Sequence, residues 1–281
     1  MPELPEVETV RRGLQRQTTG LEIARVLVHR PRVIAAPAED PAEFCRALTG
    51  RTVQEWRRRG KYLIAALDRG QWGVHLRMTG HFHWLERISA ATTAPCRHTR
   101  VQIWNSNGDE LRFVDIRSFG QMWWVPPGLA SETVITGLNR LGPEPFSEAF
   151  SAEHLQQRLK GSTRPIKNAL LDQSLVAGVG NIYADESLFA AGILPQTRSN
   201  QLGRNQLERL RQALVEVLQT SIGAGGTTFS DFRDLTGTNG NYGGVAWVYR
   251  RSGQPCRHCG TPILRERLAG RSSHWCPTCQ S

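Results

Sequence analysis

Long apolar runs are missing from this 281-residue sequence. No stretch reaches the roughly 18 apolar residues that a membrane-spanning helix needs, so we expect no such span. The N-terminus also lacks the apolar segment of a secretory signal, since residues 2–12 hold five acidic or basic side chains. These absences predict an intracellular protein, in which paired cysteines are reduced and bind metal rather than form disulfides.

Lysine is scarce as well. Of 35 basic residues, 32 are arginine, and the lysines are Lys61, Lys160 and Lys167. The planar guanidinium of arginine suits phosphate, although GC-rich coding produces the same enrichment. The formal net charge is +10. A charge of this size favours a polyanionic partner, with nucleic acid as the first candidate and an anionic membrane surface as the second.

Several catalytic signatures are absent. The sequence has no Ser-His-Asp set, no phosphate-binding P-loop and no dinucleotide fingerprint, and its eight histidines lack the spacing of metal ligands. Cys45 and Cys96 lie apart from the other cysteines, and we expect both to be small packed residues rather than nucleophiles.

Four cysteines near the C-terminus form the pairs Cys256-x-x-Cys259 and Cys276-x-x-Cys279, which sixteen residues separate. Each pair can hold a metal ion from a tight turn, and together they complete the four-thiolate shell of one structural Zn²⁺. A disulfide-stabilised knob is the alternative. Residues 245–281 carry six arginines against one glutamate. This balance is typical of a small zinc hairpin that binds nucleic acid.

The hydrophobic pattern divides the chain into β-rich and helical parts. A helix is predicted over residues 3–16, and short runs of β-branched and aromatic residues between 23 and 125 predict a sandwich or barrel. Beyond residue 145 the spacing becomes helical, most clearly over 205–223. Residues 227–246 are rich in Gly, Asn and Thr, which indicates a mobile loop around 235–242.

Three internal segments combine turn-forming residues with polar or basic groups. Glycines before Asn181 allow close backbone approach, and the following helix start would bind phosphate, although an ordinary helix-to-helix turn has the same pattern. Met78 lies in an expected β-hairpin, where a plain core role is the simpler interpretation. Arg117 and Phe119 are expected to share one face of a strand. An exposed aromatic side chain there would insert between DNA bases. The alternative is a half-buried Phe beside a solvated Arg, with no role in DNA binding.

The chain begins Met1-Pro2-Glu3. Removal of Met1 would leave Pro2 with a secondary amine whose pKa lies near ~8, so much of it is free base at neutral pH. Such an amine attacks a sugar aldehyde carbon to form a Schiff base, and the adjacent Glu3 is placed to move protons. From these residues alone this remains a hypothesis, because most N-termini have no catalytic role.

Taken together, these segments closely resemble the bacterial formamidopyrimidine-DNA glycosylases, also called 8-oxoguanine DNA glycosylase/AP lyases. The resemblance runs essentially end to end, through MPELPEVETVRRGL, RRGKYL, HLRMTGHF, DIRSFG, LGPEP, LLDQSLVAGVGNIYADESLFAAGILP, GGTTF and GRSSHWCPTCQ. It implies an α+β multidomain fold: an N-terminal β-sandwich with flanking helices, then a helix–two-turn–helix bundle and a zinc finger β-hairpin. We expect these parts at 1–130 (catalytic domain), 131–150 (linker), 151–244 (DNA-binding domain) and 245–281 (zinc finger).

The resemblance also implies an activity. Family members are monomers that bind damaged double-stranded DNA across an interdomain cleft, flip the damaged purine out of the stack, cut its glycosidic bond and nick the backbone by β- and δ-elimination. By motif, Pro2 is the Schiff-base nucleophile and Glu3 the proton donor and acceptor. Lys61 corresponds to the proton donor of β-elimination, and Arg271 to the residue of δ-elimination; both also reach phosphate.

Further residues match the DNA contacts of the family. His98 and Arg117 correspond to DNA ligands, and His75 and Asn181 to phosphate ligands. Met78, Arg117 and Phe119 correspond to the three residues that fill the hole left by the flipped base. The loop near Leu235–Tyr242 corresponds to one that caps that base.

Two departures from the family pattern and two rival functions accompany this prediction. Ser118 and Ser162 stand where relatives often carry a basic residue, so we expect DNA binding to depend less on salt unless Lys160, Arg164 or Lys167 replaces the missing contact.

An endonuclease VIII-like enzyme for oxidised pyrimidines is one rival, but the opening around Leu4 and the full 227–246 loop favour the purine enzyme. A non-catalytic zinc-dependent DNA-binding protein is the other, but the catalytic residues carried over above are all present. We expect a cytoplasmic, nucleoid-associated protein, or an organellar one in a eukaryote.

Overall fold

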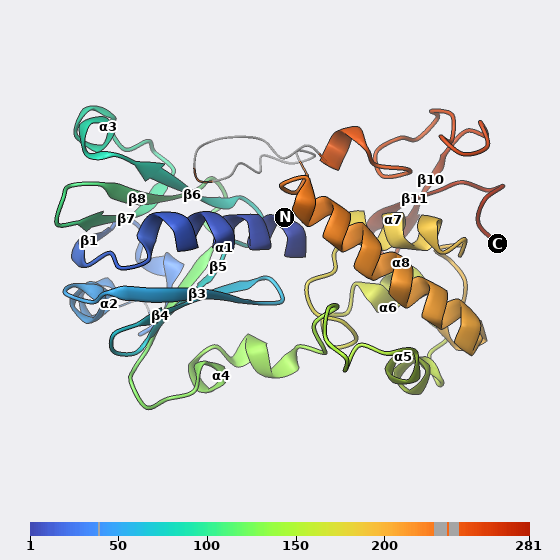
Figure 1. The fold of residues 1–281 in the computed structure, drawn as a ribbon, viewed down its shortest axis with the longest axis horizontal. Helices are drawn as coiled ribbons and strands as arrows, with labels where there is room; N and C mark the ends of the chain where they lie inside the picture. Colours follow the sequence, from blue (N-terminus) through green and yellow to red (C-terminus); the bar gives the residue numbers. More distant parts are fainter. Residues whose placement is uncertain (39, 228–234, 236–241) are drawn as a thin grey trace. The chain divides into compact units, whose positions relative to one another are not determined.

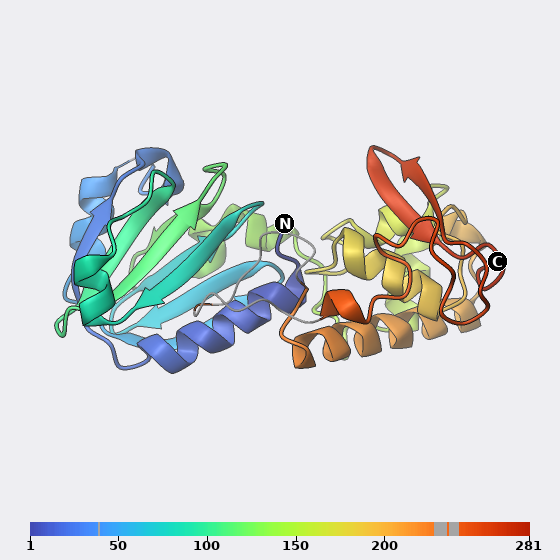
Figure 2. The same ribbon diagram turned by 90° about the horizontal axis from the view of Figure 1, so that it is seen from above.

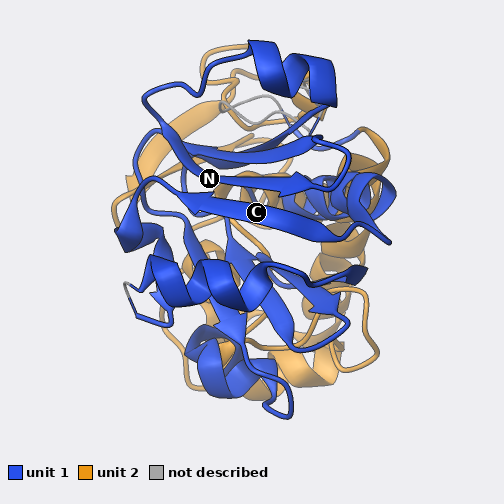
Figure 3. Cartoon of the chain, turned by 90° about the vertical axis from the view of Figure 1, so that its left-hand side faces the viewer, with its two compact units in different colours: residues 1–139, 225–241 blue, residues 140–224, 242–281 orange. Residues whose placement is uncertain are grey.

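The computed structural model describes residues 1–38, 40–227, 235 and 242–281. The chain divides into two compact units, which Figure 3 shows in different colours. Unit 1 comprises residues 1–139 and 225–241, and unit 2 comprises residues 140–224 and 242–281. This division is coarser than the four parts expected from the sequence, whose boundaries stay a prediction.

The described residues of unit 1 form two β-sheets that lie as two layers, with helix α1 (Leu4–Thr18) beside them (Figures 1 and 2). One sheet has the order β1 (Ile23–Val28), β7 (Thr99–Asn105), β8 (Glu110–Asp115), β6 (Gly80–Leu85). The other has the order β2 (Ile34–Ala36), β9 (Gln121–Val125), β5 (Gln71–His75), β4 (Tyr62–Leu67), β3 (Val53–Arg59). The pairing is antiparallel except between β2 and β9.

One hydrophobic core lies between these sheets. Trp72 of β5 meets Phe82 of β6 edge to face, with 6.1 Å between ring centroids, and so joins the two layers. Helix α1 adds Val7, Val10 and Leu14, whose 3- and 4-residue spacing places them on one buried face. The predicted β-sandwich with flanking helices is therefore confirmed.

Short elements in unit 1 were not predicted. Helix α2 (Pro41–Leu48) starts at an Asp40 side chain that accepts the Glu43 N–H at 2.8 Å. It is too short to show a clear period. The other unpredicted elements are η1 (Pro31–Val33), β2, α3 (Arg87–Thr92), α4 (Ser131–Val134) and η2 (Thr136–Arg140).

Two local expectations were wrong. The segment from His75 to Gly80 is not a hairpin, because β5 and β6 belong to different sheets and the segment crosses between them. Its tight turn requires Gly80, since a Cβ there would lie 2.5 Å from the Leu76 carbonyl oxygen. Residues 116–120 are not a strand either. They form a loop in which Ser118 takes a positive φ of 54°.

Unit 2 is helical, and α8 (Arg204–Gly223) is its longest described helix (Figure 1). Between α6 (Ile166–Leu170) and α7 (Asn181–Ala190), residues 171–180 form successive turns, in agreement with the expected helix–two-turn–helix arrangement. The remaining elements are α5 (Ala152–Leu159), η3 (Ser199–Gln201), η4 (Tyr242–Gly244) and the hairpin of β10 (Leu264–Leu268) and β11 (Arg271–Trp275). Among the described helices, none combines the length and apolar character needed to cross a membrane.

Candidate functional site

The N-terminus is fixed at the start of α1. Glu3 is the N-cap residue, and its backbone N–H donates to Glu6 Oε2 at 2.8 Å. Glu6 Oε1 also accepts the backbone N–H of Thr227 at 2.9 Å. Pro2 and Glu3 are both buried, and Glu3 is only 4% exposed. The two residues expected to carry the first chemical steps therefore have a single, well-held backbone position.

Lys61 and His75 lie close together at one end of the five-stranded sheet. Lys61 is in the turn between β3 and β4 and is 6% exposed, and His75 pairs with Tyr62 across β4 and β5. Burial, followed by the positive charges of Arg77 and Lys61, lowers the pKa of His75 to about 3. The Arg77 N–H donates to His75 Nδ1 at 3.0 Å, so the ring proton of the neutral form is on Nε2. His75 is a neutral hydrogen-bond donor at physiological pH.

Met78, Arg117 and Phe119 come from the two loops that cross between the sheets. Met78 and Phe119, respectively 39% and 42% exposed, line a pocket of about 370 Å³ together with Met1. The Arg117 guanidinium lies 4.8 Å from the centre of the Phe119 ring, at cation–π distance. The core interpretation of Met78 is therefore wrong, and the structure brings these three residues together near the N-terminus.

His98 precedes β7 and is surrounded by arginines. Its Nε2 accepts the Nε–H of Arg97 at 3.0 Å, and Arg100 Nη2 lies 3.3 Å from its Nδ1. The two isolated cysteines differ from each other. Cys45 packs against the core of unit 1 as expected, but Cys96 is exposed, so the expectation of a packed residue was wrong there.

In unit 2, Asn181 is the first residue of α7 and reaches the zinc hairpin. Its Nδ2 donates to the carbonyl oxygen of Ser272 at 3.0 Å, and Lys167 Nζ donates to the same oxygen at 2.5 Å. Arg271, the residue before Ser272, is exposed at the start of β11. Its position follows a tight turn in which Ala269 and Gly270 both have positive φ. The structure thus brings the Asn181 side chain to the backbone next to Arg271.

Lys167 itself is 1% exposed and forms an ion pair with Asp185, with 2.6 Å between Nζ and Oδ1. The expectation that Lys167 could replace a missing basic residue near Ser162 is therefore wrong, because its ammonium group is buried inside unit 2. Lys160 and Arg164 are both exposed, and Arg164 is paired with Asp172 at 3.0 Å.

Two buried acidic residues of α7 bind the C-terminal segment, and neither was predicted from the sequence. Asp185 accepts hydrogen bonds from the backbone N–H of His274 at 3.0 Å and from the Ser273 hydroxyl at 3.2 Å. Glu186 accepts three consecutive backbone N–H groups, from Trp247, Val248 and Tyr249, at 2.8–3.0 Å. The available signal was a pair of adjacent acids inside an otherwise apolar helix, since such residues are rarely buried without partners.

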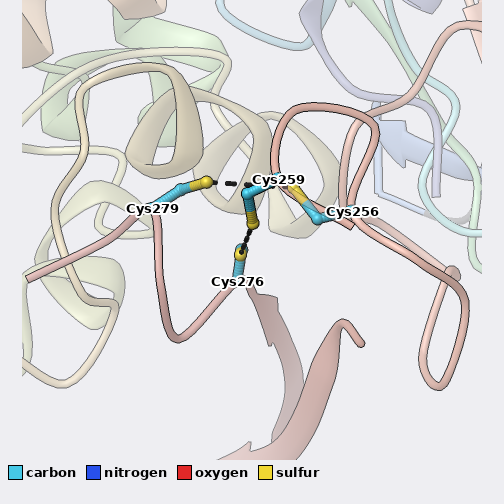
Figure 4. Close-up of side chains that lie close together, drawn as sticks. All are labelled: Cys256, Cys259, Cys276 and Cys279. Carbon is cyan, nitrogen blue, oxygen red and sulfur yellow. Dashed lines mark hydrogen bonds between the residues drawn. The ribbon is translucent and has the colours of Figure 1, made fainter. Parts of the chain in front are cut away.

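The four C-terminal cysteines converge (Figure 4). Their sulfur atoms all lie within 4.8 Å of one another, with 3.9 Å between Cys256 and Cys279 and 3.4 Å between Cys259 and Cys276. A tetrahedral zinc–thiolate site with Zn–S bonds of about 2.3 Å has sulfur separations of about 3.8 Å. The four thiols therefore fit one structural Zn²⁺, and a shell of four thiolates leaves no open position for catalysis. All six cysteines, every one of them among the described residues, are free of disulfides.

The loop expected near residues 235–242 lies outside the described residues except at its two ends. Leu235 packs into the core of unit 1, and its carbonyl oxygen accepts the Trp84 N–H at 3.0 Å. Tyr242 contacts Tyr183 within unit 2, with 5.8 Å between ring centroids.

Three family models match most of the chain. They are the formamidopyrimidine-DNA glycosylase N-terminal domain at residues 1–122, the formamidopyrimidine-DNA glycosylase H2TH domain at 141–233, and the zinc finger found in FPG and IleRS at 253–281. A protein of Parasynechococcus marenigrum (strain WH8102) named formamidopyrimidine-DNA glycosylase is 67% identical over all of both chains. A Lactococcus lactis FPG variant, solved with DNA containing Fapy-dG, aligns over all of both chains at 35% identity with a TM-score of 0.89. A MutM structure with DNA containing carbocyclic 8-oxo-G aligns equally completely, at 35% identity and a TM-score of 0.87.

Proposed function

Because this chain belongs to the formamidopyrimidine-DNA glycosylase family, we propose that it excises oxidised purines from duplex DNA and then cuts the backbone at the resulting abasic site. The observation that carries the proposal is the full-length 67% identity to a glycosylase of that name. The relatives solved with Fapy-dG and 8-oxo-G in DNA indicate which lesions this chain accepts. The net charge of +10 suits a duplex DNA partner.

The first step in this proposal uses the amine of Pro2. After Met1 is removed, the secondary amine attacks C1′ of the damaged nucleotide, the N–C1′ bond forms, and the glycosidic bond breaks with its electron pair leaving on the base. Glu3 supplies and accepts the protons that base departure and sugar ring opening require. The hydrogen bond from the Glu3 backbone N–H to Glu6 supports this role, since it holds Pro2 and Glu3 at one place.

Two eliminations then cut the backbone. Loss of a C2′ proton from the Schiff base expels the 3′-phosphate, and a second elimination expels the 5′-phosphate. We assign Lys61 to the first elimination and Arg271 to the second. The first assignment is supported by the place of Lys61 at the β3–β4 turn, close to His75, which is itself a proposed phosphate ligand. A Zn²⁺ ion held by Cys256, Cys259, Cys276 and Cys279 would supply no chemistry in this scheme and would hold the hairpin that carries Arg271.

Met78, Arg117 and Phe119 are the proposed wedge. Flipping a base leaves an unstacked gap that costs a few kcal/mol, and exposed apolar side chains offset part of that cost. An arginine at the same place can read the orphaned base through its hydrogen-bond donors. His75, His98 and Asn181 are proposed DNA-backbone ligands; His75 would donate its Nε2–H to phosphate without carrying charge.

We place the protein in the bacterial cytoplasm, in association with the nucleoid, since its partner is DNA and the relatives it matches are bacterial. The monomeric state also remains part of the proposal.

Borohydride trapping tests the function. Duplexes carrying 8-oxoguanine opposite cytosine and thymine glycol opposite adenine are incubated with the protein, and covalent adducts are mapped by peptide mass spectrometry. We expect an adduct on the first duplex, at the peptide that begins with Pro2. An adduct on the second duplex alone would favour an endonuclease VIII-like enzyme, and tight binding of both without any adduct would favour a non-catalytic DNA-binding protein.

A further inference from the structure

The two loops that carry the proposed wedge are joined by hydrogen bonds through Thr79 and Asp115. The Thr79 hydroxyl donates to Asp115 Oδ1, and the same hydroxyl oxygen accepts the backbone N–H of Arg117 at 3.0 Å. Asp115 is fully buried, and its second oxygen accepts the Gly120 N–H at 2.7 Å. We call this set of bonds the Thr79–Asp115 clasp. It fixes both ends of the segment that contains Arg117 and Phe119, and it also holds the residue that follows Met78.

A second bond supports the same connection. Arg77 Nη2 donates to Gln121 Oε1 at 2.6 Å, on the other side of Met78. The loop containing residues 76–79 is therefore bonded on both sides of Met78 to the segment 115–121, which comprises the second loop and the strand residues at its two ends. The Arg77 guanidinium strengthens this second bond, but the clasp contributes more hydrogen bonds, so it is the firmer of the two connections.

Both loops also hold an unusual backbone conformation. Arg77 and Ser118 each have φ of 54°, and they are two of the four non-glycine residues with positive φ in the described part of the chain. Such conformations persist only where surrounding interactions over-determine them, and they concentrate at functional sites. The strained residues are direct neighbours of Met78, Arg117 and Phe119. The clasp binds the backbone on both sides of Ser118, and Arg77 is held by its own hydrogen bonds to His75 and Gln121.

We propose that Thr79 and Asp115 are positioning residues that keep Met78, Arg117 and Phe119 in one preformed geometry and thereby set the selectivity of the enzyme for the base opposite the lesion. This inference rests on the proposed function, because the wedge is needed only where a base is flipped. Arg117 is the residue most directly affected, since its own backbone N–H is bound by both members of the clasp, at 3.0 Å and 3.2 Å. A loosened Arg117 loop would present its guanidinium to the orphaned base in several orientations, and discrimination would fall.

Thr79→Val tests the inference, since it keeps the shape of the side chain and removes the hydroxyl. Thr79→Ser restores the hydroxyl, and Thr92→Val removes a hydroxyl that bonds the Ile88 carbonyl on the exposed helix α3, as a matched control. Single-turnover excision of 8-oxoguanine is measured opposite cytosine and opposite adenine, beside nicking of a preformed abasic site. Hydrogen exchange of the peptide covering residues 115–121 is followed in the same proteins.

For Thr79→Val we expect a roughly tenfold loss of excision opposite cytosine, the effect of losing about one hydrogen bond to a charged group. We also expect a reduced cytosine-to-adenine ratio, a smaller loss on the abasic site because no base has to be unstacked there, and faster exchange of the 115–121 peptide. Thr79→Ser and Thr92→Val should match wild type in all four measurements.

Three results would overturn the inference: an unchanged opposite-base ratio in Thr79→Val, an equal loss in Thr79→Ser, or unchanged exchange at 115–121. A wild-type protein that excises nothing from any duplex would instead refute the proposed function. In that case the exchange measurement still decides whether the clasp holds the loops.

Discussion

Removing the charge of Lys167 should loosen the attachment of the zinc hairpin to α7. Lys167 and Asp185 are respectively 1% exposed and fully buried, and their charged atoms lie 2.6 Å apart. Breaking a buried ion pair by removing one partner costs ~3–5 kcal/mol, because the remaining charge stays buried. The two possible single substitutions are not equivalent, since the two partners have different remaining contacts.

In Lys167→Met, the Asp185 carboxylate keeps three hydrogen-bond partners, namely the Ser273 hydroxyl and the backbone N–H and ring Nδ1 of His274, at 3.0–3.2 Å. We therefore expect a loss at or below the lower end of that range, about 2–3 kcal/mol. In Asp185→Asn, the buried ammonium faces a neutral amide and the β11 backbone loses an anionic acceptor, so about 4 kcal/mol is expected. The double variant should cost less than the sum of the two, because the partners interact directly.

Zinc release into a chromogenic chelator during urea titration reports on unit 2 alone, since the four cysteines lie there. The expected order of midpoints is wild type, then Lys167→Met, then Asp185→Asn. The ratio of δ- to β-elimination products should fall in the same order, because the Ser272 backbone next to Arg271 loses its support. Midpoints equal to wild type in both single variants, or strictly additive losses in the double variant, would refute this account of the buried pair.

Three further changes test other parts of the molecule. His75→Gln should make the stability of the protein less sensitive to acid. The pKa of His75 is about 3 in the folded protein against 6.5 unperturbed, so below pH 6.5 the unfolded chain binds a proton that the folded protein does not, and wild type loses up to ~1.4 kcal/mol of stability per pH unit. Parallel curves of thermal midpoint against pH for the two proteins between pH 7 and 4 would contradict this. Ser162→Lys should steepen the slope of log binding constant against log salt by about 0.9 if the new lysine reaches a phosphate, and an unchanged slope would show that it does not. Glu3→Gln should lose excision of 8-oxoguanine by at least ~100-fold while still forming a trapped adduct with a preformed abasic site, since Pro2 keeps its amine; equal loss on both substrates would argue against separate roles.

Strand and helix positions in unit 1 were largely readable from local pattern. Strands such as β1, β4 and β9 fall within the β-rich region predicted between residues 23 and 125. Strands can be recognised in the sequence because burial of one or both faces imposes a short-range pattern of apolar residues. Elements such as α3, which buries no residue, leave no comparable pattern and were missed.

The pairing of those strands was not readable in the same way. Residues 75–80 look like a hairpin turn in sequence, yet the flanking strands pair with β4 and β9 on one side and with β8 on the other. Turn residues specify that the chain reverses and not which sheet it enters next. For the same reason the Thr79–Asp115 clasp could not be predicted from local sequence, because its members are 36 residues apart.

By itself, the sequence determined the zinc ligands, the helix at the N-terminus, the order of the strands along the chain and the family, because each depends on residues that are close together or on motifs of fixed spacing. Only the tertiary structure decided that Lys167 is buried against Asp185, that Met78 is exposed beside Phe119, and that His75 is neutral. Burial and charge environment arise from segments that meet across the fold. A residue's type and neighbours in sequence do not carry that information.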